Sequence, residues 1–251
     1  SQNHRLRLNH IMRGRMTELI CHENSYLKEF EATVTKVSEN GIILDKTAFY
    51  PGGGGQPADK GSIFFEDSEY KINGIQKEGN SYIHKIDSNE ISVGATIHGA
   101  IDWEYRYTLM RTHTALHILC GVVWRDYKAL VTGGDMKPLS ARMDFELDKL
   151  SSEFANEVET SINKEIQKEL DIEIKILDRE EAFKIPDLIR TKINLLPNSI
   201  KKIRTVNITG LDLQADGGTH VNNTKEVGKI TVTGHESKGK INKRLRIKVE
   251  N

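Results

Sequence analysis

Two short segments, about a hundred residues apart, carry side chains of the types that bind metal ions. The motif RTHTALH contains His113 and His117, and in a helix this spacing directs both imidazoles the same way, one turn apart. The motif QADGGTH contains Asp216 and His220, four residues apart around a Gly-Gly turn. Four such ligands from two segments suit one Zn²⁺ that keeps room for water or substrate. A metal site built in this way indicates chemistry more than folding.

Each motif alone has a simpler interpretation. A histidine pair at helical spacing is more often a packed or solvated pair than a pair of ligands. The sequence Asp-Gly-Gly-Thr-His is most simply a turn, in which glycine supplies positive φ and Asp and Thr bond the local backbone. The combination favours a metal, because both motifs have ligand types at ligand spacing.

The composition is typical of a soluble globular protein. The 251 residues are 37% hydrophobic and 29% charged, which suits one large or two modest domains. The 36 basic and 36 acidic residues cancel, so a nucleic-acid partner would need a local basic patch. No run approaches the roughly 20 apolar residues of a membrane span, and we expect no membrane association.

The cysteines and the first residues bear on location and processing. Cys21 and Cys120 are isolated and form no disulfide framework, which favours a reducing cytosol and a cytoplasmic location. No apolar signal region follows the start. Residues 1–15 are basic without a core pattern, so we predict that they are a tag or non-native extension and that the natural protein starts at Met16. The alternative is a basic arm that touches a polyanion.

The pattern from residue 16 to residue 104 predicts a Gly-rich domain folded as a small β-barrel. Short apolar-polar alternations separated by Gly and Asn turns favour a barrel. The loop TAFYPGGGGQP lies among them and lacks the Gly-Lys-Ser/Thr ending of a phosphate loop. It is either a flexible surface loop or a shaped loop whose glycines let the backbone approach a ligand. The predicted strands are 30–37, 41–45, 62–65, 69–72, 81–86 and 98–103.

Residues 105–251 mix helices and strands, so the whole chain is predicted to be α+β. The motif with His113 and His117 lies inside a helix expected at 105–127, and Ser151 or Ser152 caps a second helix that reaches Leu170. A short helix at 179–184 is expected to stop before Pro186. The predicted strands are 143–146, 172–176, 203–208, 228–233 and 245–249.

Four motifs in order give the sequence a specific resemblance. TAFYP with GGGQ, then RTHTALH, QADGGTH and EVG resemble the editing region of alanyl-tRNA synthetases. The chain is more similar to the stand-alone alanyl-tRNA editing proteins of the longer type, in which the Gly-rich domain comes first. The resemblance runs from Met16 to the end, and residues 105–251 resemble the second additional domain of threonyl- and alanyl-tRNA synthetases.

The resemblance implies an enzyme that acts in trans on mischarged alanine-specific tRNA. Such proteins hydrolyse the ester to a wrong amino acid, chiefly serine, with glycine left open here. A pocket sized for alanine cannot strongly reject an amino acid that differs by one hydroxyl, so a second hydrolytic site is needed. Editing of threonyl-tRNA is a related alternative, and the Gly-rich domain favours alanine tRNA.

The resemblance also implies the ligands of one Zn²⁺, which map onto His113, His117, Asp216 and His220. The family commonly has Cys where this chain has Asp216. A carboxylate binds Zn²⁺ well but selects less strongly against Mn²⁺ or Mg²⁺. The metal's identity is therefore open, and one alternative is that the metal is lost and Asp216 merely holds a histidine.

Roles for further residues follow from the same resemblance. The catalytic set is His113, His117 and His220: a bound metal polarises the ester carbonyl or activates water, or His117 or His220 acts as the base without metal. Thr47 and Gln56 would line the amino-acid pocket, although a turn Thr and a loop Gln are their simpler interpretations.

Basic residues near the histidine helix and the C-terminus are predicted to contact tRNA phosphates. The alternative for any charge run is a solvated face. The outer face of helix 152–170 is acidic and is expected to point away from RNA. The candidates for substrate binding are Arg111, Lys238, Lys240 and Arg244, with Tyr105, Arg106, Lys243 and Arg246 beside them.

Three functions are compatible with these observations. The first is trans-editing hydrolysis, the second is a non-catalytic tRNA-binding relative with a degenerate metal site, and the third is a metal-dependent hydrolase of another small ester. Salt-sensitive tRNA binding separates the first two from the third. The sequence leaves the oligomeric state open.

Overall fold

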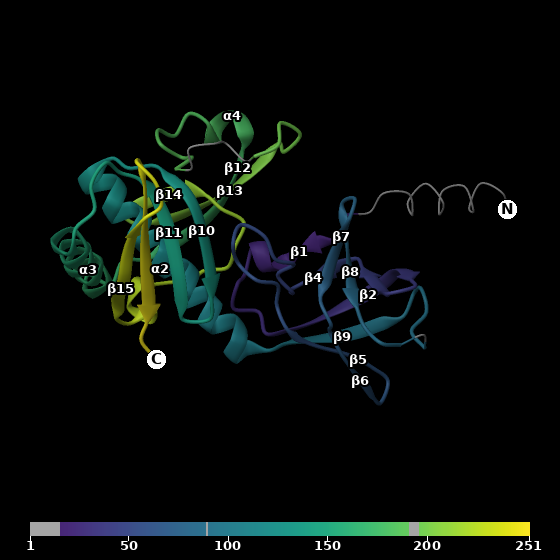
Figure 1. Cartoon of the computed structure of the whole chain (residues 1–251). Coiled ribbons are helices and arrows are strands. Elements are labelled where there is room, and N and C mark those ends of the chain that lie inside the picture. Colours follow the sequence, from purple (N-terminus) through teal and green to yellow (C-terminus); the bar gives the residue numbers. More distant parts are fainter. Residues whose placement is uncertain (1–15, 89, 191–195) are drawn as a thin grey trace. The chain divides into compact units, whose positions relative to one another are not determined.

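The computed structural model describes residues 16–88, 90–190 and 196–251 (Figure 1). These fall into two compact units. One comprises the described residues up to Gly52 together with Ala58–Arg106, and the other comprises Gly53–Pro57 and Tyr107–Asn251. The loop segment Gly53–Pro57 therefore groups with the second unit, although both its flanks belong to the first. The prediction of a tag in residues 1–15 lies outside the described residues.

A curled seven-stranded sheet forms the first unit, and every neighbouring pair in it is antiparallel (Figure 1). Its order is β6-β5-β9-β2-β3-β8-β7, and β1 and β4 form a separate parallel pair. The strands are β1 (Glu18–Leu19), β2 (Glu29–Ser38), β3 (Gly41–Leu44), β4 (Lys46–Thr47), β5 (Gly61–Phe65), β6 (Ser68–Lys71), β7 (Ile75–Glu78), β8 (Ser81–Lys85) and β9 (Thr96–Ile101), with a short 3-10 helix η1 at Ile20–His22.

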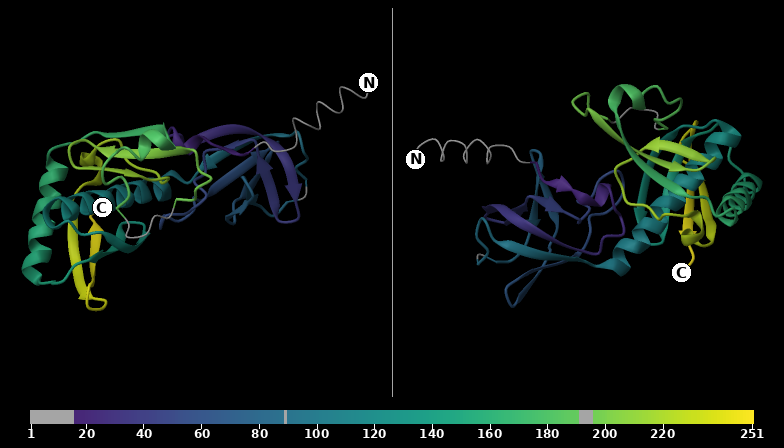
Figure 2. Two further views of the ribbon diagram at one scale, coloured as in Figure 1. Left: turned by 90° about the horizontal axis from the view of Figure 1, so that it is seen from above. Right: turned by 180° about the vertical axis from the view of Figure 1, so that it is seen from behind.

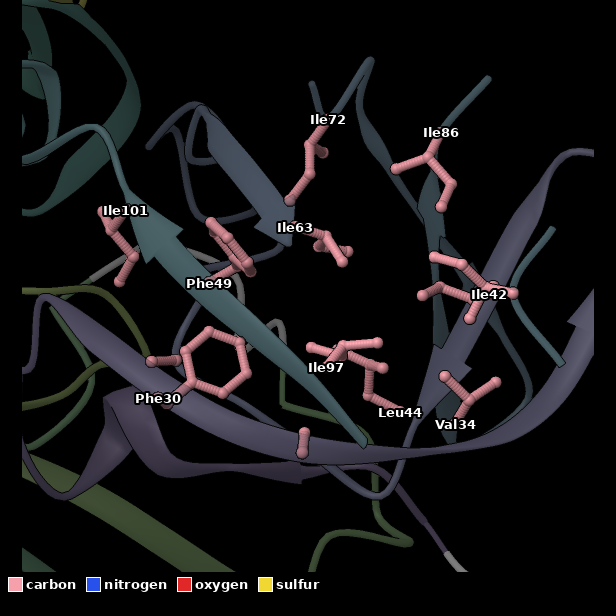
Figure 3. Packing of buried hydrophobic residues seen from close by; sticks show 13 residues of the cluster. Phe30, Val34, Ile42, Leu44, Phe49, Ile63, Ile72, Ile86, Ile97 and Ile101 are labelled. Carbon is pink, nitrogen blue, oxygen red and sulfur yellow. The ribbon is translucent and has the colours of Figure 1, made fainter. Parts of the chain in front are cut away.

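One face of this curled sheet encloses an apolar core (Figure 3). The alternating residues of β2 turn Phe30, Ala32 and Val34 inward, as the period of a strand requires. A register shift between Val34 and Lys36 interrupts the pairing of β2 with β3, and such irregularities bend a strand. Gly99 of β9 allows Phe30 to pack, because a Cβ there would lie 2.3 Å from the Phe30 ring.

The predicted β-rich character is confirmed, but closure into a barrel is not. The outer strands β6 and β7 are not paired with each other among the described residues. Sequence analysis missed β7, because the letters IQKE carry no apolar alternation. It also missed the two-residue strands β1 and β4, which are too short to show a period.

Arg106 belongs to the first unit and is completely buried. Its guanidinium donates hydrogen bonds to both carboxylate oxygens of Asp59, at 2.9 Å from Nε, and to the carbonyls of Ser25 and Ala48 at 2.9 and 2.7 Å. The expectation that Arg106 contacts tRNA phosphate is therefore wrong. Its charge is neutralised inside the protein, a pairing between distant residues that the sequence pattern does not reveal.

The second unit combines two antiparallel sheets with helices. The strands β10-β11-β16-β15 form the larger sheet and β12-β13-β14 the smaller. The elements are α2 (Trp103–Tyr127), β10 (Val131–Lys137), β11 (Ser140–Glu146), α3 (Ser152–Gln167), β12 (Ile172–Asp178), α4 (Arg179–Ala182), β13 (Lys202–Ile208), β14 (Asp212–Ala215), η2 (Thr224–Val227), β15 (Ile230–Ser237) and β16 (Asn242–Val249).

Helix α2 passes between the two sheets of the second unit (Figure 2). A helix covered on both sides needs apolar residues around most of its circumference. Met110, Leu116, Leu119 and Val122 are accordingly all buried. Gly121 permits the contact with the start of β14, since a Cβ there would lie 2.9 Å from the Asp212 side chain.

The predicted helices and most predicted strands are present. The Ser151 hydroxyl caps α3 by accepting a hydrogen bond from the Phe154 amide at 3.0 Å. The predicted strand at 143–146 extends back to Ser140. Strands β10 and β14 were missed, because VTGGDMK and DLQA lack a clear two-residue period. Among the described residues, no helix is long and apolar enough to cross a membrane.

Candidate metal centre

The four predicted ligands meet in the second unit. One ligand atom from each of His113, His117, Asp216 and His220 lies within 4.8 Å of all the others. The Asp216 carboxylate is at the centre: its Oδ2 is 3.4 Å from His113 Nε2, 3.6 Å from His117 Nε2 and 2.6 Å from His220 Nε2. Three nitrogens and one oxygen that converge in this way match the donor set of a zinc site.

Two elements bring these side chains together. Helix α2 supplies His113 and His117 from successive turns, and the turn after β14 supplies Asp216 and His220. Arg204 of β13 holds that turn, because its Nη1 donates to the carbonyls of Asp216 at 3.0 Å and of Gly218 at 2.7 Å. The Asp216 amide in turn donates to the Arg204 carbonyl at 3.0 Å.

Each imidazole also faces a polar group with its second nitrogen. His113 Nδ1 lies 2.8 Å from Gln56 Oε1, and His220 Nδ1 lies 3.0 Å from Thr114 Oγ1. His117 Nδ1 lies 3.6 Å from Asp212 Oδ2, beyond hydrogen-bond distance. Metal-binding histidines commonly have such outer partners, which fix the ring and its tautomer. The residues present therefore fit a divalent metal.

Arg190 supports the outer partner of His117. Its Nη1 donates to Asp212 Oδ1 at 2.9 Å, and Gln214 donates to Asp212 Oδ2 at 2.6 Å. Both members of the Arg190–Asp212 pair are buried. The pair places the Asp212 carboxylate beside the imidazole of His117, and burial raises the pKa of that carboxylate while His117 and Arg190 oppose the shift.

Burial and charge set the protonation of the cluster. Burial lowers the pKa of His113, His117 and His220. Burial by itself raises the pKa of Asp216, but the three facing imidazoles hold that pKa well below its usual range. Neutral imidazoles and an ionised carboxylate are the states in which these groups bind a metal.

A cavity of about 660 Å³ adjoins the cluster. His113, His117 and Asp216 form part of its wall, with Gly54, Gly55 and mostly apolar side chains around them. A groove of about 740 Å³ in the first unit is larger, but none of the four ligands lines it. The smaller cavity is therefore the candidate substrate site, within the usual range of small-molecule pockets.

The side chain of Gln56 is buried against the cluster, whereas Thr47 belongs to the first unit. The Thr47 hydroxyl is also buried, lies 2.9 Å from His84 Nε2 and accepts a hydrogen bond from the Phe49 amide at 3.1 Å. Arg111 donates to the carbonyls of Val227 and Glu250, both in the second unit. These contacts hold the Arg111 guanidinium within the second unit.

The predicted basic cluster near the C-terminus lies beside acidic residues of β11 and β15. Arg244 Nε donates to Asp144 at 2.7 Å, and this pairing lowers the pKa of Asp144. Lys238 Nζ lies 3.4 Å from a carboxylate oxygen of Glu236, and Lys240 is exposed. Lys243 is buried and bonds the carbonyls of Gly239 and Lys240. The accessible charge of the cluster therefore lies on Lys238, Lys240 and Arg246.

Sequence analysis gave no role to several residues that shape this centre. Thr114 lies between the two histidines of α2, and its hydroxyl bonds His220 in another segment. Asp212, Arg190 and Arg204 lie in or beside strands whose pattern indicates only packing. A polar residue at an otherwise buried position was the one available signal.

Two family models of aminoacyl-tRNA synthetases match parts of the chain. Residues 15–105 match the family model of class II (A) tRNA synthetases, and residues 203–246 match the second additional domain of threonyl- and alanyl-tRNA synthetases. The fold and site thus define a relative of the synthetase editing region.

Full-length relatives specify the family. The chain is 42% identical over 235 residues to the alanyl-tRNA editing protein AlaX-M of Saccharolobus solfataricus, covering 92% of this chain and 98% of that protein. It is 35% identical to AlaX-M of Methanosarcina barkeri with the same two coverages. The alanine–tRNA ligase of Ignicoccus hospitalis is 39% identical over 86% of this chain, which spans 24% of that ligase. The chain belongs to the family of alanyl-tRNA editing proteins.

Proposed function

We propose that this protein is a trans-editing deacylase that releases serine from mischarged alanine-specific tRNA. One observation carries the proposal: four ligand side chains converge beside a cavity, in a chain matched over nearly its whole length by alanyl-tRNA editing proteins. We further propose that the protein works in the cytoplasm, where its tRNA substrate is.

The proposed cofactor is one Zn²⁺ held by His113, His117, Asp216 and His220. When bound, the metal supplies a Lewis acid that polarises the ester carbonyl or activates a water. The protein's own contribution is to keep the imidazoles neutral by burial and to hold the Asp216 turn through Arg204. Aminoacyl esters are labile, so a modest catalytic contribution suffices.

The cavity supports a substrate larger than the amino acid alone. Its volume of about 660 Å³ far exceeds that of a seryl group, so we propose that it also receives the terminal nucleotide that carries the ester. By family resemblance, Thr47 is proposed to act in recognition of the amino acid, and Gln56 is proposed to act at the same site through its contact with His113. Arg111, Lys238, Lys240 and Arg244 are proposed to bind the tRNA, and the exposed Lys240 and partly exposed Lys238 suit phosphate contact best.

The test measures release of labelled serine from seryl-tRNA(Ala), with alanyl-tRNA(Ala) as the control, before and after chelation and with zinc restored. Selective hydrolysis that chelation removes and zinc restores would support the whole proposal. Equal hydrolysis of both tRNAs would contradict editing. Selective hydrolysis that is unaffected by chelation would exclude a catalytic role of the metal and leave His117 or His220 as the base.

A second candidate function has one observation in its favour. Asp216 Oδ2 lies only 2.6 Å from His220 Nε2, the contact expected if Asp216 merely holds a histidine. The protein would then bind tRNA without hydrolysing it. Salt-sensitive binding of tRNA(Ala), together with no serine release under any added divalent metal, would establish this alternative.

A further inference from the structure

Gln56 lies in the Gly-rich loop segment that groups with the second unit, and its side chain is only 2% exposed. Both of its amide atoms have protein partners. Oε1 lies 2.8 Å from His113 Nδ1 and 3.0 Å from the Thr219 amide nitrogen, while Nε2 lies 2.7 Å from Thr219 Oγ1. Gln56 therefore bridges the two segments that supply the metal ligands.

The partners of Gln56 determine the orientation of its amide group. A backbone N–H only donates, so the Gln56 atom that faces the Thr219 amide must be the oxygen. The same oxygen faces His113 Nδ1. Because a carbonyl oxygen only accepts, His113 Nδ1 must carry the proton.

The tautomer of His113 follows from this bond. A neutral imidazole with its proton on Nδ1 has its lone pair on Nε2, and His113 Nε2 points to Asp216 Oδ2 at 3.4 Å. We propose that Gln56 is a positioning residue that locks His113 in the tautomer able to bind the metal. This inference rests on the metal site of the proposed function.

Gly218 supplies independent support. A Cβ on residue 218 would lie 2.2 Å from His113 Cε1, 2.4 Å from His113 Nδ1 and 2.7 Å from Gln56 Oε1. Only glycine leaves room for the bond between these two side chains. The turn thus closes over the contact between Gln56 and His113.

The geometry favours positioning over substrate contact. Gly54 and Gly55 line the cavity, whereas Gln56 does not. Its amide has one acceptor atom and one donor atom, and both are used by His113 and Thr219. The glycines give the loop its approach to the cavity, and the glutamine anchors the loop to the histidine.

The test compares Gln56→Met and Gln56→Glu by zinc affinity, measured by competition with a chromogenic chelator. The Met variant keeps the size but loses the acceptor, so zinc affinity should fall ~10–100-fold. Glutamate keeps an acceptor for His113 and for the Thr219 amide, so its affinity should stay close to that of the wild type. Gln167→Met, at an exposed position near the end of α3, is the matched control.

A second measurement needs no variant. Nitrogen-15 NMR of the metal-free protein should show His113 as the Nδ1–H tautomer, and the Nε2–H tautomer would overturn the inference. Wild-type zinc affinity in Gln56→Met would also overturn it, as would a wild-type protein that binds no zinc. Neither readout uses hydrolysis. If zinc binding follows the predicted order but no variant or wild type releases serine, the proposed function fails while the role of Gln56 stands.

Discussion

Each unit buries a carboxylate among nitrogen donors, but the two arrangements differ in kind. In the first unit, both carboxylate oxygens of Asp59 accept hydrogen bonds from one permanent cation, Arg106, and neither side chain is exposed. In the second unit, Asp216 faces three imidazoles, and among them His220 makes the hydrogen bond, at 2.6 Å. The cation of the first cluster, Arg106, is fully buried and hydrogen-bonded, whereas His113, His117 and Asp216 of the second line a cavity.

The comparison of these two clusters shows that burial of a carboxylate can serve either stability or chemistry. Removing either partner of a fully hydrogen-bonded buried ion pair is strongly destabilising, because the remaining charge is neither paired nor hydrated. A cluster of neutral imidazoles around one carboxylate keeps lone pairs available for a ligand. The same desolvation that makes an unpaired Asp59 or Arg106 costly also lowers the pKa of the three histidines and so favours their neutral form.

Asp59→Asn gives the largest expected effect on stability. It leaves Arg106 as an uncompensated buried cation and should lower the free energy of unfolding by about 3–5 kcal/mol. Urea-induced unfolding measures the change. Asp102→Asn, at an exposed carboxylate of the same unit, is the control and should cost less than about 0.5 kcal/mol, because asparagine caps a helix about as well as aspartate and still accepts the bond from the Tyr105 amide at the start of α2. Equal losses in both variants would show that the buried pair has no special weight.

The second largest expected effect is a loss of stability in acid that comes from His84, a buried imidazole of the first unit. Burial lowers the pKa of His84 to about 4 from 6.5. The unfolded chain takes up a proton below pH 6.5 and the folded chain does not, so stability is lost as the pH falls from 6.5 to 4. The loss attributable to His84 is about 3 kcal/mol.

The difference between wild type and His84→Gln isolates this contribution, since the other buried histidines are common to both proteins. The free energy of unfolding is measured by urea at several pH values between 7 and 4. A wild-type curve parallel to that of His84→Gln would contradict the prediction.

Asp216→Asn tests the open cluster by activity. It removes the charged ligand but keeps an oxygen that can bond His220, so serine release should fall ~100-fold, equivalent to about 2.7 kcal/mol. The unfolding free energy of the metal-free protein should change by less than in Asp59→Asn, because no cation is left without a partner. Asp212→Asn should reduce the rate of serine release less, because Asp212 faces the cluster only through His117. A fully active Asp216→Asn variant would remove Asp216 from the mechanism.

The exposed lysines carry the smallest expected effects. Lys238→Ala and Lys240→Ala should each weaken tRNA binding a few-fold and reduce the salt dependence of binding by about one phosphate contact. Binding to tRNA(Ala) at several salt concentrations measures both quantities. Lys36→Ala, an exposed lysine of the first unit paired with Glu78, is the matched control. An unchanged salt dependence would mean that these lysines form only a solvated face.

Some features were predictable because they depend on local spacing. The histidines of α2 and the pair Asp216 and His220 converge as their spacing indicated, and the caps and core faces of α3 follow its helical period. Strand β10 was missed because its exposed, glycine-containing sequence gains its partners only from β11. The phosphate contact expected of Arg106 is wrong because Arg106 is paired with Asp59. The sequence pattern could not show this pair, since the two residues are 47 positions apart.

The sequence by itself determined the ligand types, their spacing, the α+β class and the family. Those properties follow from short-range periodicity and from motifs that are read in order along the chain. Only the tertiary structure decided which nitrogen of each imidazole faces Asp216, that Gln56 bonds His113, and that Arg204 holds the turn. These are directional hydrogen bonds between segments far apart in the sequence, and their geometry exists only after the segments have packed together.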